Sequence, residues 1–455
     1  GVRLMAGRMA SFLDTAFLAI ESREAMMHVG GLMPFQPPDG AGPDFTRELV
    51  GDLENNRDVS APWNFKLRFP RFLSNPLQSW VEDPAIDLDY HVRRSALPAP
   101  GGERELGMLV SRLHSIPLDF HRPAWEMHVI EGLSGGRFAI YSKMHHALVD
   151  GYTAMRILAR SLSTSPDADD AKLFFRLSER RSPRHSDVPS IAALFGLLRQ
   201  QLGATSDVTR AMLTLVKAVR AEDKDLVVPL RAPKTIFNRR ISRNRRFATQ
   251  LWDLPRLHAI AKAGNATIND VVLAVTGAAL RCLLQELDAL PNDPLIALVP
   301  VNARPKDDPG GGNQVGAMLA SLGTNEASPG KRLEAVVAST RRAKEQLAGM
   351  SKAAIVQYST MLLTPMTVQH LTGTAGRVRP AFNVVISNVP GPKEPLYFRG
   401  ARLLATYPLS VPFHGYGLNI TVNSYADSLS AGFIGCRDAL PHLQRLAVYS
   451  GHAVA

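Results

Sequence analysis

The feature that most restricts the fold is an almost wholly apolar segment from Val271 to Leu287. The residues Thr267-Ile268-Asn269-Asp270 precede it, and Thr267 with Asp270 matches the capping box that starts a helix. A helix that is apolar around most of its circumference has to be buried on most sides. The chain must therefore surround this helix with other layers, and its 455 residues suffice for two or three packed domains.

Composition and charge narrow the classes of function. Hydrophobic residues make up 45% of the chain, which is too many for a disordered protein. Lysine and arginine total 52 against 41 aspartate and glutamate, a formal net charge of +11. This excess favours phosphate-bearing ligands or anionic surfaces as partners. It does not choose between nucleic acid, lipid headgroups and a substrate with a nucleotide tail.

Cysteines and apolar segments bear on the compartment. Cys282 and Cys436 lie far apart without C-x-x-C spacing, so we expect neither a disulfide framework nor a thiolate zinc site, and a reducing compartment. No segment approaches the ~20 apolar residues that cross a bilayer, so we expect any membrane contact to be peripheral. Residues Gly1 to Arg8 lack the apolar core and cleavage site of a secretory signal.

Hydrophobic periodicity in the first part of the chain predicts a sheet packed on helices. Met127–Ile130 and Phe138–Met144 alternate like two strands, and the glycines between them predict a hairpin. After His146 the period changes to that of a helix, and Asp150 is placed to cap it. The residues on one face of this predicted helix are Met155, Leu158, Ala159 and Leu162.

A polar and basic crossover separates two units. We divide the chain into an N-terminal domain (1–185), a helical and basic crossover (186–246) and a C-terminal domain (247–455), with a helix expected from Ser190 to Arg220. Two interpretations of the basic residues stay open: a solvated, flexible crossover, or a patch for phosphate or a membrane surface. These residues lie in the acid-free segment Leu226–Trp252 and are Arg231, Lys234, Arg239, Arg240, Arg243, Arg245 and Arg246.

The second unit has its own strands and helices. Leu295–Val301 and Phe382–Ser387 look like strands. Leu418–Ser424 and Leu429–Gly435 predict a hairpin, and their alternation favours a half-exposed antiparallel sheet. A helix is expected after Asp438.

Several common motifs can be excluded. Gly132 to Gly136 satisfies G-x-S-x-G, but a nucleophile elbow leads into a helix and here a strand is predicted to follow. Gly415-Tyr416-Gly417 lacks the third glycine of a dinucleotide fingerprint, and there is no P-loop motif. No histidine has a second ligand at metal-site spacing on a helix, so we expect no metal.

The informative stretch is Met144 to Gly151, with two histidines followed by Asp150. If a strand runs into the pair, His145 and His146 point to opposite faces and have different functions. A neutral imidazole near neutral pH can take a proton from a hydroxyl and return it to a leaving group. Gly151 lets the backbone approach a ligand closely. A buried histidine and a helix cap would explain the same residues without catalysis.

His145 to Gly151 resembles the HHxxxDG active-site motif of the bacterial wax ester synthase/diacylglycerol acyltransferase family, which belongs to the HxxxD acyltransferase superfamily. The chain is most similar to actinobacterial triacylglycerol synthases. Pro123-Ala124-Trp125 departs from the family's Pro-Leu-Trp, which bears on acceptor or acyl-length preference. The other matching segments follow in the family's order and are Phe17–Glu21, Met27–Gly31, Thr267–Val272, Pro300–Arg304, Asn383–Pro392, Leu418–Ile420 and Ser424–Tyr425.

The resemblance implies a role for each matching residue. His146 would be the general base, with His145 beside it in the catalytic group. Asp150 would be structural and pair with Arg304, which on physical grounds alone would be a surface guanidinium. Asn269 would polarise a carbonyl and, together with Ser387 and backbone N–H groups near Gly151, would stabilise the oxyanion of the tetrahedral intermediate.

The remaining matches have both a family role and a plain structural role. Asp270 would cap its helix. Ser387 and Asn388 would contact substrate, or merely end a strand before a rigid turn. Trp125 and Glu21 match positions near the site, whereas physical chemistry alone makes Trp125 part of the core and Glu21 a surface charge.

The resemblance also implies an α/β fold of the α+β type, with two domains like chloramphenicol acetyltransferase. Each domain would be a mixed sheet flanked by helices, with the active site at their interface. The implied reaction transfers an acyl group from acyl-coenzyme A to diacylglycerol, or to a long-chain alcohol to make a wax ester, without a cofactor. The enzyme would work in the bacterial cytoplasm, in peripheral contact with the inner membrane or lipid droplets.

Three alternatives remain. One is an acyltransferase of polyketide or peptide metabolism whose donor sits on a carrier protein. Another is a non-catalytic protein that binds lipid or coats lipid droplets. Nucleic-acid binding is the weakest, because the basic segment 226–252 carries only three aromatic residues, Phe237, Phe247 and Trp252.

Overall fold

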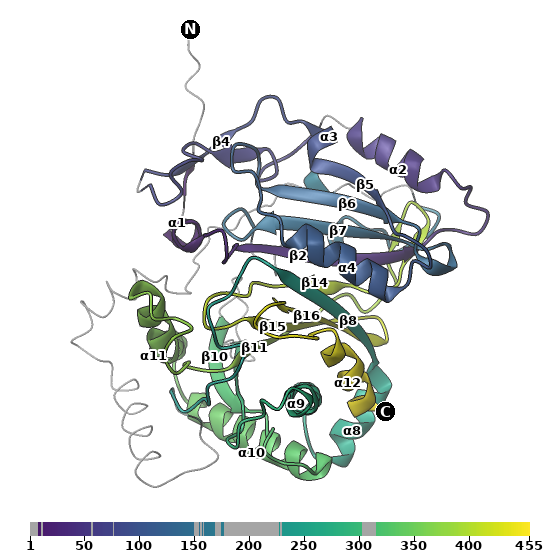
Figure 1. Cartoon of the computed structure of the whole chain (residues 1–455). Coiled ribbons are helices and arrows are strands. Elements are labelled where there is room, and N and C mark those ends of the chain that lie inside the picture. Colours follow the sequence, from purple (N-terminus) through teal and green to yellow (C-terminus); the bar gives the residue numbers. More distant parts are fainter. Residues whose placement is uncertain are drawn as a thin grey trace.

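The computed structural model shows two mixed α/β units stacked on one another (Figure 1). Asp150, Gly151, Arg304 and the helix expected from Ser190 to Arg220 lie outside the residues that the structure describes. The described residues are 8–10, 12–55, 58–75, 77–149, 154, 157, 159–168, 174–176, 227, 230–302 and 315–455.

The first unit is built on a seven-stranded sheet of order β12-β13-β2-β7-β6-β5, in which β14 also pairs with β2. Helix α4 (Glu103–His114) packs on the face that meets the second unit, and α2 (Phe45–Glu54) lies over the other face with α3 (Leu88–His91). The predicted hairpin is confirmed, because β6 and β7 are antiparallel neighbours. The strand bounds are β2 His28–Gln36, β5 Val92–Ala96, β6 Trp125–Glu131 and β7 Phe138–His145, with a short helix η1 at Ser134–Gly136.

The second unit wraps a six-stranded sheet around helix α9 (Ile268–Glu286). Figure 1 shows α9 end-on, with the sheet on one side and α8, α10 and α12 around the rest. Its burial confirms the prediction from sequence. The sheet order is β10-β9-β11-β15-β16-β8, and the bounds are β8 Arg245–Asp253, α8 Leu254–Ala263, β9 Ile296–Asn302, β10 Val315–Ser321, α10 Pro329–Leu347, α11 Lys352–Leu371, β11 Val384–Val389, β15 Leu418–Tyr425, β16 Ser428–Cys436 and α12 Arg445–Val454.

Two expectations about apolar segments were wrong. Contrary to the expectation that no segment is long enough, helix α9 is long and apolar enough to cross a bilayer. However, 67% of its most apolar stretch is buried inside the unit, as in a core helix. The hairpin of β15 and β16 is not half-exposed, and β15 pairs in parallel with β11. Its polar face is buried by the segment near β14 (Tyr407–Leu409), where Thr406 Oγ1 donates to Asn423 Oδ1.

The two units share strands. Residues 397–409 belong to the second half of the sequence, yet they complete the sheet of the first unit. Strand β13 pairs with β2 through Leu403 and Phe35, and β14 pairs with β2 through Tyr407 and Leu32. The added strands are β12 Tyr397–Phe398, β13 Ala401–Leu403 and β14 Tyr407–Leu409.

A small three-stranded sheet stands beside helix α1 (Phe12–Ile20). Its strands are β1 (Arg8–Met9), β4 (Ser79–Glu82) and β3 (Phe65–Leu67), in that order. Trp80 Nε1 donates to Asp14 Oδ2 over 3.3 Å and so ties this sheet to α1. A short helix η2 (Phe174–Arg176) adds aromatic side chains to the neighbouring core.

Candidate active site

Strand β7 delivers the two histidines to the edge of the first unit. His145 is its last residue and pairs with His28 of β2. The chain then turns, because the N–H of Leu148 donates to the carbonyl of His145 over 2.9 Å. His145 is 1% exposed, whereas His146 is half-buried. The two side chains therefore have different surroundings, as predicted.

Both ring nitrogens of His145 are engaged in holding this turn. The N–H of Ala147 donates to Nδ1 over 3.1 Å, so the proton sits on Nε2, which donates to Glu21 Oε2 over 3.2 Å. The backbone N–H of His145 donates to the carbonyl of Ala124. With both nitrogens occupied by protein groups, the geometry gives His145 a positioning role toward its neighbour.

Glu21 is not the surface charge that physical chemistry alone predicted. Its side chain is 7% exposed, and Oε2 accepts hydrogen bonds from the N–H of Met27 as well as from His145. The carbonyl of Met27 in turn accepts from the N–H of His146 over 2.9 Å. One carboxylate therefore links the end of α1 to both histidines.

The ring of His146 stacks on the ring of Phe17. Their centroids lie 4.0 Å apart with 19° between the planes. Phe17 belongs to α1, four residues before Glu21, so one helical turn presents the stacking ring and the carboxylate together. From sequence alone, Phe17 has no predicted role beyond its place in the N-terminal signature.

Replacing Phe17 with leucine is expected to lower the turnover number about threefold to tenfold, because an aromatic pair contributes about 0.5–1.5 kcal/mol beyond its buried area. Phe17→Tyr keeps the stack and should restore most of the rate. The measurement is steady-state thiol release across pH 5 to 9. An unchanged turnover number and pH profile for Phe17→Leu would show that the stack does not position His146.

Trp125 has the core role that physical chemistry predicted. It is 1% exposed, its Nε1 donates to the carbonyl of Trp63 over 2.8 Å, and its ring stacks on His91 at 4.5 Å. Ala124, where the family has leucine, is 2% exposed and supplies the carbonyl that accepts from His145. The departure from the family motif thus lies directly behind the histidine pair.

Asp270 forms the predicted capping box. The N–H of Asp270 donates to Thr267 Oγ1, and the N–H of Thr267 donates back to Asp270 Oδ2 over 2.9 Å. Its other oxygen, Oδ1, accepts from Thr340 Oγ1 of α10 over 2.6 Å. This carboxylate holds the start of α9 and is fully occupied there.

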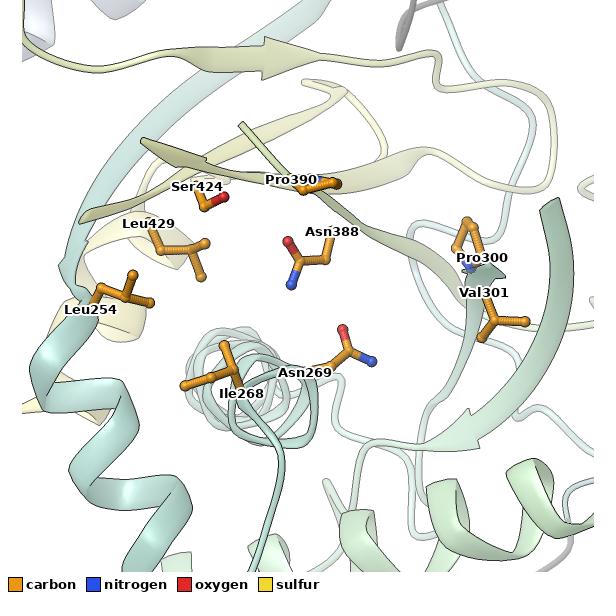
Figure 2. A pocket seen from close by; sticks show the side chains of 9 residues that line it. All are labelled: Leu254, Ile268, Asn269, Pro300, Val301, Asn388, Pro390, Ser424 and Leu429. Carbon is orange, nitrogen blue, oxygen red and sulfur yellow. The ribbon is translucent and has the colours of Figure 1, made fainter. Parts of the chain in front are cut away.

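Asn269 points into a pocket of about 420 Å³ at one end of the second sheet. Figure 2 shows Asn269 at the start of α9 across from Asn388 at the end of β11, with Ser424 at the end of β15. Ser387 does not line the pocket, because neighbouring residues of a strand face opposite sides. The described residues that line it are Leu254, Ile268, Asn269, Pro300, Val301, Asn388, Pro390, Ser424 and Leu429.

The predicted site residues therefore fall into two groups. His145, His146 and Glu21 meet at the edge of the first unit. Asn269 and Asn388 meet in a pocket lined by the second unit, and His146 is not among its lining residues.

The basic crossover has two parts. Arg245 begins strand β8 and is 2% exposed, and its guanidinium donates to the carbonyls of Ser242 and Glu24. Burial lowers the pKa of Arg245 to about 10. The interpretation as a solvated, flexible crossover is therefore wrong for Arg245. The second part contains Lys234, Arg239 and Arg240, whose side chains are exposed.

Metal-binding side chains do not gather anywhere in the described part of the chain, where no group of three or more His, Cys, Asp or Glu residues is placed to hold an ion. Cys282 and Cys436 are both free, the first exposed and the second buried.

The chain matches two family models: the wax ester synthase/diacylglycerol acyltransferase catalytic domain over residues 11–272, and the WS/DGAT C-terminal domain over residues 311–454. A putative diacylglycerol O-acyltransferase of Mycobacterium tuberculosis is 51% identical over 97% of this chain and 95% of its own length. The O-acyltransferase WSD of Acinetobacter baylyi is 41% identical over 96% of this chain and 94% of its own.

Solved structures agree with the sequence matches. The wax ester synthase/diacylglycerol acyltransferase from Marinobacter aquaeolei VT8 superposes with a TM-score of 0.78 at 38% identity, covering 98% of each chain. The first condensation domain of the CDA synthetase superposes with a TM-score of 0.55 at 17% identity, covering 100% of this chain and 98% of that one. This second likeness concerns the fold alone, and it fits the expected two-domain architecture.

Proposed function

Because the chain belongs to the wax ester synthase/diacylglycerol acyltransferase family, we propose that it transfers a long-chain acyl group from acyl-coenzyme A to the hydroxyl of diacylglycerol, and also to long-chain alcohols. One observation carries the proposal beyond family membership. The half-buried His146 is held by its backbone and its ring on a scaffold that fixes His145 and Glu21.

In this mechanism the imidazole of His146 takes the proton of the acceptor hydroxyl. The alkoxide oxygen attacks the thioester carbonyl carbon and forms a tetrahedral intermediate. That intermediate collapses with cleavage of the carbon–sulfur bond, and the imidazolium returns the proton to the departing thiolate. No acyl-enzyme and no cofactor are needed, because acyl-coenzyme A is a substrate and the chemistry is proton transfer and acyl exchange.

We assign Asn269 and Asn388 to substrate binding. Two amide side chains facing one pocket suit a substrate with amide groups, and the pantetheine arm of coenzyme A is one. The excess positive charge of +11 suits its phosphates. We assign no substrate contact to Ser387.

Asn269→Ala is expected to raise the Michaelis constant for acyl-coenzyme A about fivefold, because one neutral hydrogen bond contributes about 1 kcal/mol. The turnover number should change little. Steady-state kinetics at varied acyl-coenzyme A distinguish this from the oxyanion role expected from sequence, for which the turnover number would fall about 100-fold to 1000-fold. Thr421→Ala, a buried change in the same sheet that does not line the pocket, serves as the control.

The proposed function is tested by measuring thiol release from palmitoyl-coenzyme A with diacylglycerol or hexadecanol as acceptor. Acceptor-dependent release supports the proposal and ranks the two acceptors. No release with either acceptor from folded protein would contradict it. Release from a carrier-bound donor alone would favour the carrier-dependent alternative.

We propose that the enzyme works in the bacterial cytoplasm at the surface of the inner membrane or of lipid droplets. Diacylglycerol and its triacylglycerol product are too apolar to dissolve as free molecules, so an enzyme that uses them has to approach a lipid surface. Cell fractionation followed by detection of the native protein tests this, and recovery in the supernatant alone would contradict it.

A further inference from the structure

The loop between β3 and β4 holds the two most exposed large apolar side chains among the described residues. Phe72 is 69% exposed and Leu77 is 67% exposed, whereas Leu371 follows at 53%. Single exposed apolar side chains are common on protein surfaces. Two of them five positions apart on one loop form a small apolar tip. Arg68 and Arg71 are also exposed on the same loop.

This loop is held in shape by the fold. The buried side chain of Gln78 donates from Nε2 to the carbonyls of Phe69 and Phe72, and its Oε1 accepts from the N–H of Phe69. The side chain of Leu73 packs against the core of the first unit. Phe72 and Leu77 are therefore presented to solvent from a loop whose base is anchored.

The loop and the strands that flank it carry positive charge and no acidic residue between positions 59 and 81. Neither Arg68 nor Arg71 forms an ion pair with a carboxylate within the described part of the chain. Apolar side chains that enter the boundary of a lipid layer, next to arginines that attract its headgroups, are the pattern of peripheral membrane binding.

We infer that the loop between β3 and β4 binds the surface of an anionic phospholipid layer, with Phe72 and Leu77 between the headgroups and Arg68 and Arg71 against the phosphates. This inference deepens the proposed function, because it names the surface from which the enzyme takes its acceptor. The identity of that acceptor rests on the proposed function.

The small sheet that carries the loop is attached to helix α1. The carbonyl of Gln78 accepts from the N–H of Ala10, and Trp80 donates to Asp14 of α1. The same helix carries Phe17, whose ring stacks on His146. The loop is therefore connected to the histidine pair through the small sheet and α1.

The chain is well suited to a fluorescence test. All four native tryptophans are buried, with exposed fractions of 0%, 4%, 1% and 2% for Trp63, Trp80, Trp125 and Trp252. In Phe72→Trp, the fluorescence emission of the introduced indole should shift to shorter wavelength when vesicles of brominated phosphatidylcholine with about 30% phosphatidylglycerol are added. The bromine atoms should also quench this emission. The matched control is Val448→Trp, at a side chain that is 50% exposed on α12, and it should show neither effect.

Vesicle co-sedimentation tests how much the apolar side chains and the arginines each contribute to the affinity for vesicles. Phe72→Ala with Leu77→Ala should weaken binding about tenfold or more, and Arg68→Gln with Arg71→Gln about 30-fold on anionic vesicles. Equal quenching of both tryptophan variants, or wild-type binding by both double variants, would overturn the inference.

Thiol release from palmitoyl-coenzyme A is measured separately for the same protein, without vesicles, with detergent-dispersed hexadecanol as the acceptor. Quenching without thiol release would contradict the proposed function and leave the inference standing. Thiol release without quenching would contradict the inference and leave the proposed function standing.

Discussion

His146→Ala is expected to lower acceptor-dependent thiol release about 100-fold to 10,000-fold, the range that a positioned general base contributes. The alanine variant keeps the backbone N–H that donates to Met27, so the turn should remain in place. The loss should fall on the turnover number, because the imidazole acts on the reacting hydroxyl.

The measurement is steady-state thiol release from palmitoyl-coenzyme A with saturating diacylglycerol. His121→Ala is the matched control, since the side chain of His121 is 57% exposed in the same unit and should tolerate replacement. A turnover number for His146→Ala within threefold of the wild type would remove His146 from the mechanism.

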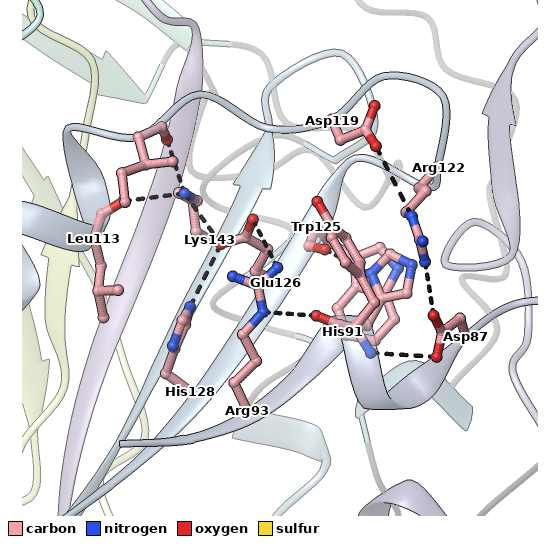
Figure 3. Close-up of polar contacts among 12 residues, drawn as sticks. Asp87, His91, Arg93, Leu113, Asp119, Arg122, Trp125, Glu126, His128 and Lys143 are labelled. Atoms are coloured by element: carbon pink, nitrogen blue, oxygen red, sulfur yellow. Dashed lines mark hydrogen bonds and ion pairs between the residues drawn. The ribbon is translucent and has the colours of Figure 1, made fainter. Parts of the chain in front are cut away.

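Glu126→Gln is expected to destabilise the protein by about 3–5 kcal/mol at pH 7, the usual cost of breaking a buried ion pair. The side chains of Lys143 and Glu126 are 0% and 5% exposed, and their charged atoms lie 3.2 Å apart (Figure 3). Lys143 Nζ also donates to the carbonyl of Leu113, in the last turn of α4, and to that of Ile116 just beyond the helix. Without Glu126, this ammonium is left in the core without its counter-charge.

The pKa values give the destabilisation a pH dependence. Burial raises the pKa of Glu126, but His128, Lys143 and Arg93 outweigh it and lower the pKa to about 2. In the wild type, the ionised Glu126 therefore stabilises the folded state fully above its ordinary pKa of 4.5. This stabilisation is lost as the pH falls toward 2. Burial lowers the pKa of Lys143, which Glu126 partly offsets.

In Glu126→Gln the pKa of Lys143 should fall further, so the folded state binds fewer protons than the unfolded state and stability rises with pH. The difference in free energy of unfolding between the wild type and Glu126→Gln, measured with urea, should therefore shrink between pH 7 and pH 10. Glu103→Gln is the control, because Glu103 is 59% exposed in its pair with Arg137 and should cost at most about 1 kcal/mol. A deficit that is equally small for both variants would contradict the prediction.

Local patterns in the sequence predicted those parts of the fold that local physics determines. The capping box of Thr267 and Asp270 and the apolar run after it define α9 without any knowledge of the rest. The glycines between β6 and β7 have positive φ, which explains why their spacing indicated a hairpin. Alternation also placed Leu418, Ile420 and Val422 on one face of β15, toward α9.

Features that depend on distant contacts could not be predicted in this way. Glu21 and His145 are 124 positions apart, and a lone glutamate after a helix gives no sign that it is buried. The polar face of β15 looked solvent-facing, because nothing in its own alternation shows that residues 404–409 cover it. The resemblance indicated that Glu21 and the histidines lie together, and only the structure supplied the contacts.

The contribution of residues 397–409 to the sheet of the first unit limits how this enzyme can be recombined with its relatives. A chimera joined within the crossover would place β2 of one parent beside β13 and β14 of another, so its register would depend on strands from two different parents pairing with each other. Residues 397–409 should therefore be inherited with the first half, although they lie far downstream of it. The natural modules of this protein are discontinuous in sequence, and gene-fusion boundaries have to follow the sheet.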